Sequence, residues 1–378
     1  MPRIPNTPVV LSEDSYTILN GIRNTIGGEF RQVTPLVEDA QSLAAYGEVV
    51  MGSGEFRNKY LGLLGKIALQ IIEHRAYSNP LKSLKRGVLD YGEMVEIDWV
   101  KLTMPEGYTQ SPVNPGDVFK TANPETMFTW HPVNSKLVYK CTINDSEIAL
   151  CFKNANGVMD AINTIIARSY DSSEWDEQLV MVATLARAYL DNKAKVAVQI
   201  PEVTKANSDD IVITEKNVSN DLRFMNAKYN IAGEPAHTPI EDQVFLITSK
   251  MSAVTDVGSL AKAFNLDYNK FVGQSIMIDD FTFDDVKLAR LDKIMQETAD
   301  QGLTPGYTPF TSEELEALSK VQGVIMDRKF LVIYDRLVEM REQVDNLHLN
   351  VQYMLHLWKI YSYNVFAQIR FFTTEELG

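Results

Sequence analysis

The chain has 378 residues, of which 45% are hydrophobic and 23% charged, and these ordinary globular values exclude a disordered or fibrous protein. Its 36 basic and 50 acidic side chains give a net charge of −14, which repels nucleic acid unless a local basic patch intervenes. No run of eighteen apolar residues occurs and the Pro-rich start lacks a signal-peptide core, so we expect no membrane span and assembly in a cytoplasm.

The first third of the chain begins with Pro2, Pro5 and Pro8, which predict an extended arm over residues 1–11. A short helix follows from an N-cap at Ser12 and ends at Gly27-Gly28. After a connecting stretch to about Gly54, the pattern predicts a helix over 56–67, then a strand over 69–77 that Asn79-Pro80 ends.

A period-2 strand is predicted where Val95, Ile97 and Trp99 alternate with acidic residues, and the alternation returns over residues 137–143. Between them, residues 103–136 contain five prolines and little regular pattern. We therefore predict a projecting hairpin of these two strands with a long Pro-rich tip. A structureless stretch of this length needs a function, so we expect residues 100–135 to contact another subunit.

The remaining elements form a long helix and a second compact region. Trp175, Leu179, Val182, Leu185 and Tyr189 mark the buried face of a helix over 173–193, and the polar residues 202–220 indicate a linker or a mobile loop. From Pro239 onward we predict a buried strand at 244–247, further strands at 276–278 and 329–334, a helix at 257–264, a charged helical insertion over 284–320, and one very long strand or two over 350–372.

The sequence contains no complete motif with the residue spacing of a catalytic or metal-binding site. Gly62 to Lys66 resembles the end of a phosphate loop but lacks its first glycine and its Ser/Thr, which favours a helix packed through small residues. The five histidines have no metal spacing, and Cys141 and Cys151 have no CxxC, so we expect reduced structural cysteines. The densest carboxylate group favours a solvated acidic turn over a calcium or magnesium site: Asp279, Asp280, Asp284 and Asp285.

Two side-chain groups remain as candidates for binding. The only basic run, Arg75 with Lys82, Lys85 and Arg86, lacks the aromatic partners of a nucleic-acid patch and favours contact with an acidic face of another subunit. An aromatic stripe near the end of the chain favours a sheet core over a sugar or cofactor platform: Tyr353, Trp358, Tyr361, Tyr363, Phe366, Phe371 and Phe372. The subunit-interface candidates are Lys82, Lys85, Arg86 and Trp130.

Several stretches resemble, in the same order, the major capsid proteins of small short-tailed phages of the phi29 type, which adopt the HK97-like capsid fold. They are Ser15-Tyr16 with Ile22-Arg23-Asn24; Asn79-Pro80-Leu81-Lys82 through Lys85 to Gly87; Leu260-Ala261-Lys262-Ala263-Phe264-Asn265 with Gly273; Val332-Ile333-Tyr334-Asp335 with Met340; and His356 with Trp358. None is specific alone, and their collinearity carries the resemblance.

The resemblance implies an α+β fold with an N-terminal arm, an extended loop, a peripheral domain containing the long helix as its spine, and an axial domain. These correspond to residues 1–65 for the arm and first helix, 66–145 for the peripheral strand and extended loop, 146–238 with the returning strands 341–378 for the peripheral domain, and 239–340 for the axial domain. Some members carry an additional immunoglobulin-like domain, and the insertion 284–320 is longer than the family pattern.

The implied function is that of a shell protein without enzymatic activity or cofactor. Copies of the chain would form pentamers and hexamers and close into an icosahedral or elongated phage head around double-stranded DNA, without sequence-specific binding. A scaffolding protein and a portal would be its partners, and the virion its location. Two alternatives remain: a cellular nanocompartment shell around cargo enzymes, and a metal-dependent hydrolase that uses Asp279, Asp280, Asp284 and Asp285.

Overall fold

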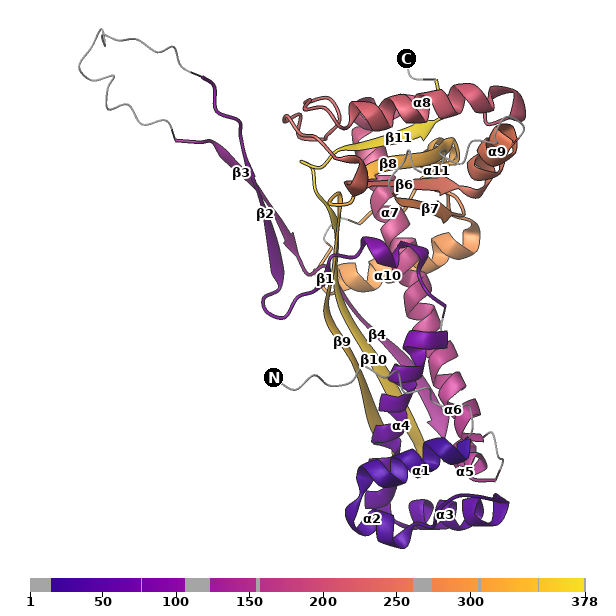
Figure 1. Ribbon diagram of the computed structural model, residues 1–378. Helices are drawn as coiled ribbons and strands as arrows, with labels where there is room; N and C mark the ends of the chain where they lie inside the picture. Colours follow the sequence, from indigo (N-terminus) through magenta and orange to yellow (C-terminus); the bar gives the residue numbers. More distant parts are fainter. Residues whose placement is uncertain are drawn as a thin grey trace, which may run out of the picture. The chain divides into compact units, whose positions relative to one another are not determined.

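The computed structural model describes residues 15–75, 77–105, 123–153, 157–260, 274–304, 307–345 and 347–376, shown in Figure 1. The arm predicted over residues 1–11 lies outside the described residues, as do residues 106–122 of the Pro-rich stretch. The chain divides into two compact units. The first comprises Met1–Asn79, Lys136–Glu177 and Leu337–Trp358, and the second comprises Pro80–Ser135, Gln178–Arg336 and Lys359–Gly378.

The first unit begins with four helices, α1 (Ser15–Ile26), α2 (Gly28–Val33), α3 (Ala40–Gly52) and α4 (Gly54–Arg75). The end of α1 at Gly27 is confirmed, since this residue adopts φ +62°, a left-handed conformation that favours glycine. The predicted connecting stretch is wrong, because α2 and α3 occupy it, and Asp39 and Ser42 start α3 with a reciprocal capping box.

The strand predicted over 69–77 is also wrong, because α4 continues as a helix to Arg75. Short apolar runs such as Leu69 to Ile72 do not distinguish a strand from a buried helix. The small-residue interpretation of α4 is confirmed. A Cβ on Gly65 would lie 3.4 Å from Tyr353 Cε1 and one on Gly62 2.8 Å from Glu342 Oε1, so both glycines let the helix approach other side chains closely.

The core of the first unit joins these helices to α5 (Asp145–Cys151), α6 (Gly157–Ile165) and the π-helix η3 (Ile166–Tyr170). It contains a cluster of aromatic rings. The Phe30 ring packs edge-on to both Tyr46 and Phe56, and Phe152 packs against Tyr46 and Tyr60. Cys141 and Cys151 are both free and buried in this core, and burial raises the pKa of the Cys151 thiol to about 11. A raised pKa keeps the thiol protonated, consistent with a structural role.

The chain also forms a four-stranded sheet and one long helix. β4 (Ser135–Asn144), β9 (Leu331–Asp345) and β10 (Asn350–Tyr363) belong to a sheet of order β1-β9-β10-β4, where β1 is Gly87–Val88. The long helix predicted over 173–193 is confirmed as α7 (Asp171–Val196). Trp358 is only partly buried, and Lys136 Nζ lies 4.6 Å from the centroid of its ring.

The second unit is built on a five-stranded sheet of order β5-β11-β8-β6-β7. Its strands are β5 (Ala197–Gln199), β6 (Gln243–Thr248), β7 (Gln274–Ile278), β8 (Val321–Asp327) and β11 (Ile369–Thr373). The strands predicted at 244–247, 276–278 and 329–334 are confirmed. Residues 350–372 form two strands, β10 and β11, which was one of the two alternatives for this stretch. Since β11 pairs with β5 and β8, the end of the chain belongs to the second unit.

Helices pack on both faces of this sheet. Successive side chains of a strand point to opposite faces, so Phe371 and Phe372 of β11 contact different helical layers. The ring of Phe371 lies 5.2 Å from that of Tyr189 in α7. The ring of Phe372 lies 5.8 Å from that of Phe245, within a buried cluster that includes Ile211 and Val218 of α8 (Ser208–Asp221). The linker or mobile loop predicted over 202–220 is therefore wrong: Ile211 and Val218 lie on one helical face, and their tertiary packing makes the segment a helix.

The remaining elements of the second unit are short. They are α9 (Ser249–Leu260), α10 (Asp285–Asp300), α11 (Ser312–Ser319) and the 3-10 turns η1 (Pro80–Leu84), η4 (Lys205–Asn207) and η5 (Ile240–Asp242). The helical insertion over 284–320 is confirmed by α10 and α11. Each begins at a side-chain cap, Asp284 for α10 and Thr311 for α11.

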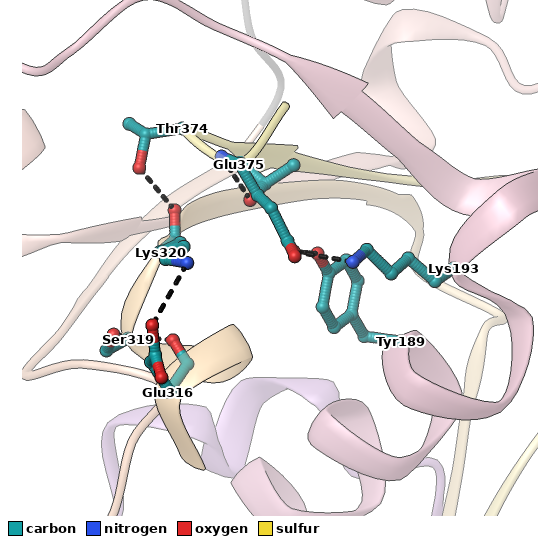
Figure 2. Close-up of polar contacts among 8 residues, drawn as sticks. Tyr189, Lys193, Glu316, Ser319, Lys320, Thr374 and Glu375 are labelled. Atoms are coloured by element: carbon teal, nitrogen blue, oxygen red, sulfur yellow. Dashed lines mark hydrogen bonds and ion pairs between the residues drawn. The ribbon is translucent and has the colours of Figure 1, made fainter. Parts of the chain in front are cut away.

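The end of β11 is fastened by polar contacts that Figure 2 shows. Glu375 forms an ion pair with Lys193 of α7 at 2.6 Å, and the Tyr189 hydroxyl lies 3.5 Å from the same carboxylate. The Thr374 amide donates to the Lys320 carbonyl oxygen at 3.0 Å, between α11 and β8. These contacts hold the end of β11 against α7 and against the connection between α11 and β8.

The close packing of α3 yields a test with a matched control. A Cβ added at Gly47 would lie 2.5 Å from Phe152 Cβ, whereas one at Gly21 of α1 meets nothing within 4 Å. Gly47→Ala should therefore lower the free energy of unfolding by about 1–3 kcal/mol through overpacking, although alanine is the better helix former. Gly21→Ala should raise it by about 0.5–1 kcal/mol. Thermal unfolding of the free subunits measures both, and a stabilised Gly47→Ala variant would contradict the packing.

Glu215 yields a second test, because it lies on the buried face of α8 with 5% exposure. Its Oε1 has no hydrogen-bond partner in the described part of the chain, and burial raises its pKa to about 8. The carboxyl is neutral in the folded chain but ionises in the unfolded chain above pH ~4.5, so its contribution to stability falls as the pH rises from about 4.5 to 8.

Glu215→Gln should therefore stabilise the subunit relative to the wild type, by little at pH 5 and by about 2–4 kcal/mol at pH 8. The exposed Glu202→Gln variant serves as the control and should show no such trend. Chemical denaturation at several pH values measures the difference. A Glu215→Gln effect that is independent of pH would show that the carboxyl is ionised in the folded chain.

Candidate subunit interface

The hairpin of the second unit is formed by β2 (Met94–Val100) and β3 (Thr126–Pro132), which run antiparallel in a two-stranded sheet (Figure 1). The first strand is confirmed, but the predicted partner over 137–143 is wrong. Met94 faces Pro132 and Val100 faces Thr126, while residues 137–143 form β4 of another sheet. The partner strand lies inside the Pro-rich stretch, whose prolines concealed the alternation of residues 126–131.

One face of this hairpin is exposed and combines aromatic with acidic side chains. The register sets Glu96 opposite Trp130 and Asp98 opposite Phe128. Trp130 is 51% exposed and Phe128 57%, and their rings pack edge to face with centroids 5.9 Å apart. Met94 and Val100 extend the apolar surface at the two ends of β2. We refer to Met94, Glu96, Asp98, Val100, Phe128 and Trp130 as the outer face.

The opposite face fixes the hairpin to other residues of the second unit. Trp99 stacks on Phe366, with centroids 5.7 Å apart and rings inclined by 13°. The Asn134 amide donates to the Tyr361 carbonyl oxygen at 2.7 Å and accepts from the Tyr361 amide at 2.9 Å. At the far end of β2, Lys101 forms ion pairs with Glu125 and Glu234, which raise the pKa of its amine. The hairpin is therefore held along its length by both apolar and polar contacts.

His131 is the titratable group at the base of the hairpin, and only 4% of it is exposed. Its Nδ1 lies 2.7 Å from Ser362 Oγ and its Nε2 3.0 Å from Thr129 Oγ1. Burial, and secondarily the positive charge of Arg86, lower the pKa of the imidazole. The ring is therefore held neutral at neutral pH, and it serves the packing of the hairpin base.

The basic interface candidates are found in or next to η1. Lys82 is exposed. Lys85 is mostly buried and forms an ion pair with Asp335 at 2.6 Å, while Lys359 Nζ lies 3.6 Å from the other oxygen of the same carboxylate. Arg86 donates from Nε to the Leu331 carbonyl oxygen at 3.0 Å and from Nη2 to that of Lys329. Lys85 and Arg86 therefore fasten η1 and β1 to β9 of their own unit.

The structure places the four predicted interface residues in three different environments. Trp130 lies on the outer face, Lys82 on the surface, and Lys85 and Arg86 at internal contacts. Sequence reasoning missed Phe128 and Asp335, whose partner Lys85 lies 250 positions earlier. The only sequence signal for Asp335 was its position as a charged residue just after the apolar run Leu331 to Ile333. Their contact with a neighbouring subunit stays a prediction.

The acidic turn before α10 is occupied by structural contacts. Asp284 accepts from the Lys287 amide as an N-cap, and Asp279 forms an ion pair with Lys287 Nζ at 2.6 Å. Among the residues that the structure describes, no three His, Cys, Asp or Glu side chains gather as metal ligands would. Across the same residues, no helix combines the length and the apolar character needed to span a membrane.

A 220 Å³ cavity in the second unit is also lined without reactive groups. Arg187 enters it from α7, but its guanidinium lies over the Phe310 ring and pairs with Glu314 at 2.9 Å. Tyr307 donates its hydroxyl to Asp292, and burial raises the pKa of this phenol. These groups stabilise the packing of α7 with α10 and α11.

Comparison with solved structures gives the class of fold. A chain in the capsid structure of Staphylococcus phage Andhra matches with a TM-score of 0.57 at 12% identity, covering 81% of this chain and 86% of that one. The mixed α+β arrangement is therefore that of phage capsid proteins with the HK97-like fold.

Comparison of sequences gives the family. The model of the Phi29-like phage major capsid protein matches residues 19–373, so the chain belongs to this family. The major capsid protein of Bacillus phage GA-1 is 25% identical over 359 residues, 94% of this chain and 68% of that protein. That of Streptococcus phage Cp-1 is 23% identical over 376 residues, 95% and 94% of the two chains.

Membership of this family makes the chain a structural protein of the virion that builds the head shell, and not an enzyme. The resemblance found in the sequence is thereby confirmed, and the phage capsid is selected over the nanocompartment shell and the metal-dependent hydrolase. The family does not identify the residues that join one subunit to the next.

The contacts of Lys85 predict how its loss acts. Lys85→Met removes one of the two cations at the largely buried Asp335, so the free energy of unfolding of the free subunit should fall by roughly 2–4 kcal/mol. Asp90→Ala, which removes an exposed carboxylate, should change it by less than about 0.5 kcal/mol. Thermal unfolding measures both. A Lys85→Met subunit of normal stability that fails to assemble would place Lys85 at the interface itself.

Proposed function

We propose that copies of this chain form pentamers and hexamers that close into a head shell around double-stranded DNA, and that the β2–β3 hairpin joins neighbouring subunits. The observation that carries this proposal is the outer face. Phe128 and Trp130 are more than half exposed on a two-stranded sheet, although large aromatic side chains gain most from burial. An exposed apolar patch of this kind marks an interaction surface.

The physics of a hairpin supports the same role. An isolated two-stranded sheet is at best marginally stable in water, so the hairpin depends on its base and on whatever covers its outer face. The base is supplied by Trp99, His131 and Asn134, which contact residues 361–366 of the same unit. A second subunit is the partner that a self-assembling shell provides for the other face.

The basic residues take two roles in this proposal. Lys82 contacts the neighbouring subunit directly from the exposed surface of η1. Lys85 and Arg86 support that contact by holding η1 and β1 on β9 through Asp335 and two backbone carbonyl oxygens. An interface segment anchored in this way loses little conformational freedom when the subunits associate.

The domain assignment is proposed on the same basis. The first unit, with its helical core, supplies the peripheral domain, and the five-stranded sheet of the second unit supplies the axial domain. The hairpin is the extended loop. The returning strands predicted over 341–378 are divided, because β11 pairs with β8 of the second unit.

A scaffolding protein, a portal and the packaged DNA complete the proposed set of partners. The net charge of −14 supports an inner wall that binds DNA weakly and without sequence preference. Weak binding suits a shell into which DNA is driven, because a strongly basic wall would hold the DNA where it first touched.

The hairpin proposal predicts the effect of shortening it. Replacing residues 94–132 by a short Gly-Ser turn should abolish shells while the subunit keeps one cooperative thermal transition, because two buried hydrophobic clusters of the described chain contain no residue of the hairpin. Deletion of residues 106–122 alone separates the tip from the strands and should weaken assembly less. Electron microscopy of the proteins produced with the other head proteins of the phage gives the result. Normal shells from the fully shortened chain would exclude the hairpin as the joining element.

A further inference from the structure

We propose that the outer face of the hairpin binds residues 223–228 of a second copy of the chain. The inference rests on the proposed function of the hairpin as a joining element and adds the surface that receives it. It is carried by two exposed patches of the second unit that match in both charge and apolar character.

The outer face supplies two carboxylates among aromatic rings. Glu96 and Asp98 are exposed and form no ion pair within the described part of the chain. The strand register sets each of them opposite an exposed ring, Glu96 opposite Trp130 and Asp98 opposite Phe128. A ring face beside a carboxylate favours a cation, because the ring quadrupole and the negative charge both attract it.

The segment after α8 supplies the opposite character. Phe224 and Met225 are 69% and 53% exposed, and they stand between the exposed cations Arg223 and Lys228. Neither cation forms an ion pair with another described residue. An apolar pair exposed to this extent is unusual on a surface that makes no further contact.

Residues 223–228, the receiving segment, are held in place by contacts with other residues of the same unit. Its Asn226 exchanges backbone hydrogen bonds of 3.0 Å with Ala236. The guanidinium of Arg370 lies 4.4 Å from the centroid of the Tyr229 ring and donates to the Lys228 carbonyl oxygen at 2.7 Å. The segment is therefore ordered before it meets a partner, which lowers the entropic cost of binding.

The two patches fit each other as one interface. The outer face presents four apolar side chains and two carboxylates, and residues 223–228 present two apolar side chains and two cations, so the charges of the two patches are opposite. Both patches are exposed in a single copy, so the contact is made between copies. Different surfaces of identical subunits meet head to tail, and such heterologous contacts close into rings when the rotation is that of a pentamer or hexamer.

Charge reversal tests this pairing because both patches can be reversed in one chain. E96K/D98K should place four cations at the contact and reduce the yield of shells at least tenfold, and R223E/K228E should do the same with four acids. The chain that carries all four substitutions restores opposite charges and should recover at least half of the wild-type yield. Sedimentation and electron microscopy of chains produced with the other head proteins of the phage measure these yields.

Two controls keep the result specific. All four residues are exposed, so the free variants should unfold at the wild-type temperature. R31E/K205E reverses two exposed cations elsewhere, and neither its own assembly nor its combination with E96K/D98K should differ from the respective parent. Rescue by R31E/K205E would mean that only net charge matters and would overturn the pairing.

The outcomes distinguish the pairing from the function on which it rests. Normal shells from E96K/D98K would overturn both the pairing and the use of the outer face in assembly. If E96K/D98K fails to assemble while R223E/K228E assembles normally, or if the chain with all four substitutions is not rescued, the hairpin remains the joining element. The receiving surface then lies elsewhere, and the pairing is overturned.

Discussion

A two-stranded sheet cannot form a core of its own, and this constraint governs how the hairpin of this capsid protein is built. Trp99 and His131 use one face to contact Phe366 and Ser362 of the same unit. Phe128 and Trp130 on the other face remain exposed within one chain. The sequence therefore carries aromatic side chains that a single subunit does not bury, which is what a protein selected to assemble requires.

The base of the hairpin is fixed by residues that are distant in sequence. Asp335 binds Lys85, and the segment 361–366 receives Trp99, His131 and Asn134. A rigid base matters because every subunit has to present the outer face in the same direction. Burial lowers the pKa of His131, so its imidazole carries no charge near neutral pH. In the proposed interface, Lys85 and Arg86 act by positioning η1 and β1, and Lys82 presents its exposed side chain to the neighbouring subunit.

The family and much of the fold could be predicted from the sequence, because the collinear stretches and the periodic elements are local signals. The α7 helix, β2, β6 and the helices of the insertion follow the expected periods. The strand β3 could not be found among prolines, and α8 could not be recognised because its narrow apolar stripe gains meaning only against β6 and β11. The role of Lys85 depended on Asp335, a pairing that no local pattern contains.

The central claim is that the outer face of the hairpin is buried between copies in the shell. A three-dimensional reconstruction of the assembled particle by electron cryomicroscopy, at a resolution that shows side chains, tests it directly. The account predicts that Phe128 and Trp130 of each copy are covered by a neighbouring copy, with Glu96 and Asp98 beside basic side chains of that neighbour. An outer face that points into solvent in every copy of the shell would contradict it.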